Sequence, residues 1–114
     1  NFLEKIYKTK KKMYIVSGSD EKELISVLKD KKVIHFFQKV LGSPTDKKTN
    51  TTMVKKENPS TDNGIYFGDS KLDYLCAKEF NMDFIFVKKF SEWKDFDKYE
   101  NQFLMTINDF EDVV

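Results

Sequence analysis

Two carboxylates, Asp69 and Asp73, stand four residues apart directly after a short apolar run. The run Ile65-Tyr66-Phe67 predicts a buried strand, and Gly68 predicts a tight end to that strand. In α/β proteins, ligands gather beyond the carboxyl ends of such strands. Mg²⁺ takes oxygen ligands, so the spacing predicts that both carboxylates converge on one such cation.

The same residues also fit a purely structural role. Ser70 followed by Asp73 is the signature of a capping box, in which the serine caps a helix and the acid reaches back to the serine amide. Both interpretations of Asp73 stay open. No packing reason explains Asp69 at the end of the strand, so Asp69 is the stronger candidate for a metal ligand.

Two further stretches place polar side chains after apolar segments. Ser17 and Gly18 follow the apolar run 13–16, and Lys47 follows the short run 39–41 and a Gly-Ser-Pro turn. A hydroxyl, backbone amides at a helix start and an ammonium suit a phosphate group. We therefore expect Ser17 and Gly18 to bind phosphate and Lys47 to neutralise charge that develops during transfer. Lys48 adjoins Lys47, and the sequence leaves open which lysine makes the contact.

The elements that position these residues alternate along the chain. Helical periodicity predicts helices over 2–8, 20–31, 49–56 and 70–80, and a short turn over 33–37. Apolar runs predict strands over 13–16, 39–41, 65–67, 83–87 and 103–107, while 88–102 is expected to be a loop with a helical turn. This order implies a three-layer, Rossmann-like α/β fold with a parallel sheet. We expect residues 1–114 to form a single domain.

Composition excludes several classes of protein. The chain has 20 Lys, no Arg and a net charge of +1, which disfavours nucleic-acid recognition. No apolar run is long enough to cross a membrane, and no signal-peptide pattern is present. The one cysteine, Cys76, is expected in the core and allows no internal disulfide, which fits the cytoplasm. The one histidine, His35, is expected to be a packing or surface residue.

Three of these stretches together resemble the haloacid dehalogenase superfamily, and within it the phosphoglycolate-phosphatase-like members. The stretch 13–19 looks like the second motif of that family, 42–47 looks like the third, and 65–73 looks like the fourth. The resemblance runs from about residue 2 to residue 87, and more loosely to residue 114. It implies Mg²⁺ as the cofactor, a small phosphorylated metabolite as the substrate, and an attack on phosphorus by an aspartate.

The first motif of the family, a strand followed by Asp-x-Asp, is missing. The resemblance places that strand centrally, between the strands that end at Ser17 and Asp69, so those strands must face a gap or pair directly. Two stretches have acids at a similar spacing, 95–97 and 109–111, and neither is expected to reach the required position. Because the chain begins with Asn1, we expect the nucleophile to lie upstream, or on a complementing chain.

Two functions follow. The first is a Mg²⁺-dependent phosphomonoester hydrolase that works through an aspartyl-phosphate in the complete protein, with Ser17 and Lys47 as catalytic residues and this chain alone inactive. The second is a non-catalytic α/β module that binds a phosphate-bearing ligand or a protein partner.

Overall fold

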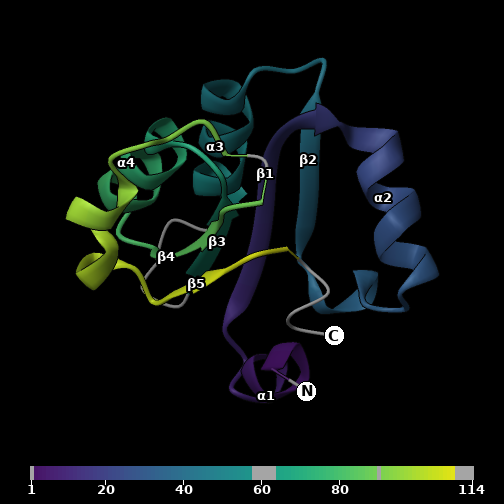
Figure 1. Cartoon of the computed structure of the whole chain (residues 1–114). Coiled ribbons are helices and arrows are strands. Elements are labelled where there is room, and N and C mark those ends of the chain that lie inside the picture. The colour runs from purple at the N-terminus through teal and green to yellow at the C-terminus, as the bar shows by residue number, and fades with distance from the viewer. Residues whose placement is uncertain (1, 58–63, 90, 110–114) are drawn as a thin grey trace.

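The computed structural model describes residues 2–57, 64–89 and 91–109, and they form one twisted sheet with helices on both faces (Figure 1). The strands are β1 (Lys12–Asp20), β2 (Lys39–Ser43), β3 (Gly64–Gly68), β4 (Asp83–Val87) and β5 (Met105–Ile107). Their order in the sheet is β2-β1-β3-β4-β5, and every pairing is parallel. The predicted parallel α/β sheet is confirmed.

The helices lie in the expected order. They are α1 (Phe2–Lys8), α2 (Glu21–Asp30), α3 (Lys47–Glu57) and α4 (Lys71–Glu79), with 3₁₀ turns η1 (Ile34–Phe36), η3 (Phe96–Lys98) and η4 (Glu100–Gln102). Four predicted boundaries are wrong by two residues or more. Strand β1 ends at Asp20 instead of at residue 16, and β2 ends at Ser43 instead of at residue 41. Helix α3 begins two residues earlier than expected, because the Asp46 carboxylate accepts the Thr49 amide at 2.9 Å and so provides a cap. Strand β5 begins at Met105 instead of at Phe103.

The two faces of the sheet build two separate parts of the core. Successive residues of a strand point to opposite faces. Thus Ile15, Phe67 and Ile85 pack with Leu28 of α2, whereas Tyr66 and Phe86 belong to the other cluster. That second cluster includes Val54 of α3 and an aromatic group that follows β4: Trp93, Phe96, Tyr99 and Phe103. Figure 1 shows α2 on one side of the sheet and α3 and α4 on the other, which completes three layers.

Strands β1 and β3 pair with each other directly. The partners run from Lys12 with Gly64 to Ile15 with Phe67. Of the two arrangements expected without a central strand, a gap or direct pairing, the structure has direct pairing. The sheet is therefore continuous through the described part of the chain, and the carboxyl ends of β1 and β3 lie next to each other.

Some predictions fall outside the description. The sequence predicts a loop over 58–64; residues 58–63 lie outside the description, and Gly64 is the first residue of β3. It also predicts that Asn108 or Asp109 caps a final turn, which includes residues that the structure does not describe. Among the described residues, none of the helices is both long and apolar enough to span a membrane.

Candidate functional site

The start of α4 holds Asp69 and Asp73 at the carboxyl end of β3. The Ser70 side chain accepts the Asp73 amide at 3.2 Å, and Asp73 Oδ2 accepts the Ser70 amide at 3.1 Å, so the predicted capping box is present. Asp73 Oδ2 also accepts the Asp69 amide at 2.9 Å. The strand can approach this closely because Gly68 has no side chain; a Cβ there would lie 2.5 Å from Asp73 Cβ.

Lys47 joins the two carboxylates. Its Nζ donates to Asp69 Oδ1 at 2.9 Å and to Asp73 Oδ2 at 2.8 Å. The side chains of Lys47, Asp69 and Asp73 are 17%, 41% and 0% exposed, so Asp69 is the acid that faces solvent. Lys47 makes these two contacts, whereas the neighbouring Lys48 is exposed. Lys47 was expected in a loop but is the first residue of α3.

Burial and charge act against each other in this group. Burial lowers the pKa of Lys47, but the charge of Asp73 and hydrogen bonds to both carboxylates outweigh it, so the pKa is raised. Burial raises the pKa of Asp73, against the charge and the hydrogen bond of Lys47. Because Asp73 accepts a bond from the ammonium and several more from amides and hydroxyls, we describe Lys47 and Asp73 as an ion pair at neutral pH.

Two buried hydroxyls that no sequence motif indicated, those of Tyr66 and Thr51, support Asp73 from behind. The Tyr66 hydroxyl donates to Asp73 Oδ1 at 3.2 Å and lies 2.9 Å from the Thr51 hydroxyl. Thr51 in turn donates to the backbone oxygen of Lys47 at 2.8 Å. The network therefore ties β3, α3 and α4 together. The only signal in the sequence was a tyrosine within an otherwise apolar strand, and an apolar run alone does not show which face each residue takes.

Ser17 and Gly18 lie near this group, but not where the sequence predicted. Both belong to β1, and α2 begins only after Asp20, whose side chain accepts the Glu23 amide at 3.1 Å. The expectation that the amide of Gly18 stands at a helix start is therefore wrong, because β1 continues through an irregular end to Asp20. A Cβ on Gly18 would lie 3.4 Å from Lys47 Cε, so the backbone of Gly18 passes close to the lysine.

A hollow of about 200 Å³ joins Ser17 to Asp69. It also contains Lys89 and Asp109, whose side chains pair at 3.2 Å. The apolar part of its wall comes from residues of β1, α2, β3 and β4: Ile15, Val16, Leu24, Phe67 and Val87. Asp109 follows the last strand and was not expected to reach Ser17, yet the sheet brings both residues to the same hollow.

Other candidates lie elsewhere. Asp95 and Asp97 lie at η3 and do not line the hollow that joins Ser17 to Asp69. His35 is exposed and contacts Tyr7 and Phe36, with ring centroids 6.4 and 4.1 Å away. Cys76 is buried in the core as expected, and burial raises the pKa of its thiol. Within residues 2–57, 64–89 and 91–109, no three His, Cys, Asp or Glu side chains gather into a metal site.

Solved structures of other proteins share the fold of this chain. A search of curated proteins finds no match. Among solved structures, a “Putative Phosphatase from Clostridium difficile” aligns with a TM-score of 0.67 and 19% identity, over 97% of this chain and 54% of that one. A haloacid dehalogenase-like family hydrolase from Streptococcus pneumoniae aligns with a TM-score of 0.59 and 19% identity, over 98% of this chain and 54% of that one.

The chain thus spans about half the length of these two structures, and at this identity they establish the fold alone. The family itself is established by sequence. Residues 1–87, which include the whole Lys47, Asp69 and Asp73 group, match the profile of the haloacid dehalogenase-like hydrolases. The chain therefore belongs to the haloacid dehalogenase-like hydrolase family.

Proposed function

We propose that the complete protein is a Mg²⁺-dependent phosphomonoester hydrolase and that this chain supplies the phosphate-binding and metal-binding part of its site. The observation that carries the proposal is the Lys47 ammonium held between Asp69 and Asp73, at 2.9 and 2.8 Å, at the carboxyl edge of a parallel sheet. Substrates of this class are small phosphorylated metabolites, and the cytoplasm is the proposed location.

The charges around Lys47 suit a divalent cation. The formal charges of two carboxylates and one ammonium add up to −1. The group therefore still attracts a cation, although the Lys47 ammonium already lies between the two acids. Asp69 is the proposed direct ligand, since its side chain is 41% exposed. Asp73 is the proposed second metal-site residue. Its side chain is buried and its oxygens already accept hydrogen bonds, so it would hold Asp69 in position and add negative charge. Mg²⁺ bound to few carboxylates normally takes water and substrate phosphate as its other ligands.

The other residues act on the phosphate. The Ser17 hydroxyl would donate a hydrogen bond to a phosphoryl oxygen, and the Gly18 backbone amide would donate a hydrogen bond to the same phosphate. Lys47, whose Cε lies close to Gly18, would neutralise the negative charge on the transferred group. Bound Mg²⁺ would supply further neutralisation of phosphate charge.

The attacking carboxylate is proposed to come from outside these 114 residues. The resemblance to the family implies an aspartate that forms an aspartyl-phosphate as the bond to the leaving oxygen breaks, after which water releases phosphate. The chain covers 54% of each similar solved structure, which supports a longer functional unit. A complementing chain is the second proposed source. By itself this chain is proposed to be inactive.

Asp69→Asn in the complete protein tests the proposal. The change removes the charge of the outward-facing ligand, and we expect Mg²⁺-dependent phosphate release to fall at least about 100-fold. Asp83→Asn is the matched control, since Asp83 is an exposed acid at the other end of the sheet and should leave turnover unchanged. Turnover that survives Asp69→Asn would contradict the metal role.

A second candidate function has its own support. The direct pairing of β1 with β3 closes the sheet without a further strand, as a self-sufficient binding module would require. Such a module would bind a phosphate-bearing ligand or a protein partner without catalysis. Cooperative unfolding of the isolated chain as a monomer, together with phosphate binding and no turnover in the complete protein, would favour this module over the hydrolase.

A further inference from the structure

A second hollow is also lined by Asp69. It has a volume of about 490 Å³, which is within the range of small-molecule sites. Its wall combines the candidate site with the start of α4 and the segment after β4: Lys47, Asp69, Ser70, Lys71, Leu72, Glu92 and Trp93. A phosphate held at Lys47 and Asp69 would therefore have this hollow beside it, with room for the rest of the substrate.

Hydrogen bonds tie Trp93 to the candidate site. The Ser91 hydroxyl donates to the Asp69 backbone oxygen at 2.5 Å, and the Trp93 amide donates to the Ser91 hydroxyl oxygen at 3.1 Å. The position of Trp93 relative to Asp69 is thus set by two successive bonds.

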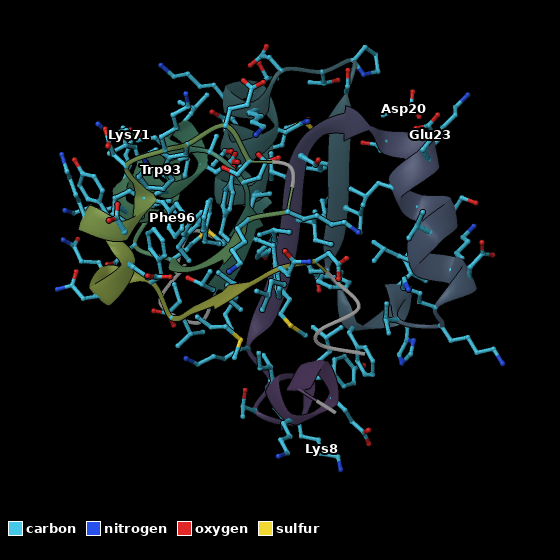
Figure 2. All side chains as sticks on the ribbon, in the orientation of Figure 1. Lys8, Asp20, Glu23, Lys71, Trp93 and Phe96 are labelled. Atoms are coloured by element: carbon cyan, nitrogen blue, oxygen red, sulfur yellow. The ribbon has the colours of Figure 1, made fainter. Side chains whose placement is uncertain are left out.

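Packing holds the indole ring from behind. Its centroid lies 5.8 Å from that of Tyr74, 5.6 Å from that of Phe86 and 5.5 Å from that of Tyr99. Figure 2 shows Trp93 and Phe96 on the same side of the molecule as Lys71. A half-buried aromatic ring that is fixed on one side and lines a hollow on the other is a ready surface for stacking.

The remaining wall adds apolar area and charge. Leu72 is 48% exposed and lines this hollow, so its side chain adds apolar area to the wall. Lys71 Nζ lies 5.5 Å from the centre of the Tyr99 ring, so a cation–π contact holds this lysine at the rim. Glu92 adds an acid. An apolar wall with a polar rim suits a flat ring that carries hydrogen-bonding groups.

We infer that this hollow receives the leaving group of the substrate, and that it selects phosphomonoesters whose leaving group contains a flat ring. In this arrangement Trp93 and Leu72 make the apolar contacts with the ring, while Lys71 and Glu92 bind its polar groups. The inference rests on the proposed hydrolase function, which it narrows from phosphomonoesters in general to ring-bearing ones.

Binding can be measured on the chain itself, because Trp93 is its single tryptophan. We expect phenyl phosphate with Mg²⁺ to quench the intrinsic fluorescence and to bind about tenfold more tightly than glycerol 2-phosphate, as expected for one stacked ring. Leu72→Ser and Lys71→Gln should weaken phenyl phosphate binding several-fold.

Two matched variants on the same helix serve as controls. Leu75 is 47% exposed and Lys78 is also exposed, but neither lines this hollow, so Leu75→Ser and Lys78→Gln should bind as the unchanged chain does. Absence of quenching, or equal weakening in all four variants, would overturn the inference.

Kinetics of the complete protein separate this inference from the proposed function. Trp93→Ala should lower the ratio of kcat/KM for phenyl phosphate to that for glycerol 2-phosphate about tenfold, and Trp93→Phe should restore most of the ratio. An unchanged ratio would refute the leaving-group site even if the protein is a phosphatase. If the unmutated protein hydrolyses neither ester, the hydrolase proposal fails, and the inference that rests on it fails with it.

Discussion

The starts of helices α2 and α4 look alike in the sequence and differ in the structure. Each has a capping residue followed three positions later by an acid, Asp20 with Glu23 and Ser70 with Asp73. At α2 the cap accepts the Glu23 amide at 3.1 Å, and both acids are exposed. Figure 2 shows Asp20 and Glu23 on the opposite side of the molecule from Lys71, the first residue of α4.

At α4 the same motif is buried and charged. Asp73 is 0% exposed and receives hydrogen bonds from Lys47 and Tyr66 in addition to those of the capping box. A capping box therefore forms from local sequence alone. It becomes a candidate site only where other elements bury it and place charged side chains against it. The start of α2 thus provides an internal reference for the start of α4.

The two helix starts should differ most in the free energy of unfolding when the acid three positions after each cap, Asp73 or Glu23, is replaced by its neutral amide. Asp73→Asn leaves the partly buried Lys47 ammonium paired with Asp69, whose side chain is 41% exposed, and we expect a loss of about 1.5–3 kcal/mol in the free energy of unfolding. Glu23→Gln, at the matching position of α2, should change it by less than about 0.5 kcal/mol. Urea denaturation followed by circular dichroism measures both.

The double variant Asp73→Asn with Lys47→Met sharpens this test. Removal of the second charge should recover part of the loss, because in Asp73→Asn the partly buried ammonium has lost its buried partner and keeps the more exposed Asp69. A cost below about 1 kcal/mol for Asp73→Asn would show that the two helix starts are energetically alike.

Alkaline pH should lower the free energy of unfolding through Lys47 and Tyr66, which contact Asp73 at the start of α4. The pKa values of Lys47 and Tyr66 are raised above their ordinary 10.5 and 10.0, Lys47 by its pairing with the acids despite burial, and Tyr66 by burial and by the charge of Asp73. The unfolded chain therefore loses these protons first, so their stabilisation is complete below about pH 10 and is lost as pH rises beyond it. Each group contributes a slope of up to about 1.4 kcal/mol per pH unit.

Unfolding free energies between pH 9 and 11.5 check this prediction. Tyr66→Phe should flatten the decline, whereas Tyr7→Phe, at a tyrosine that is 52% exposed, should leave the slope as it is. Equal slopes for all three proteins would mean that Tyr66 titrates as it does in the unfolded chain.

The smallest effect is expected at the cap of α2. Asp20→Ala removes one side-chain acceptor from the first turn and should cost about 1 kcal/mol in the same denaturation experiment. Asp20→Asn keeps an acceptor and should restore most of this loss. A cost for Asp20→Ala as large as that for Asp73→Asn would remove the contrast between the two helix starts.

Local order was predictable from the sequence, since neighbouring residues decide it. Apolar runs such as 65–67 and 83–87 marked strands, and the Ser70-x-x-Asp73 spacing marked the start of α4, because backbone periodicity and capping act within a few residues. The placement of Asp69 at a strand end also followed, since a parallel sheet brings its carboxyl ends to one edge.

The tertiary structure alone decided which side chains meet. Lys47 instead of Lys48 reaches Asp73 because α3 begins two residues early and turns that lysine toward β3. Tyr66 and Thr51 support Asp73 only because α3 packs on the face of the sheet to which Tyr66 points. The sequence determined that helices and strands alternate along this chain and that acids follow a strand end. Burial and long-range packing, which no local pattern encodes, determined that one of those acids pairs with a lysine.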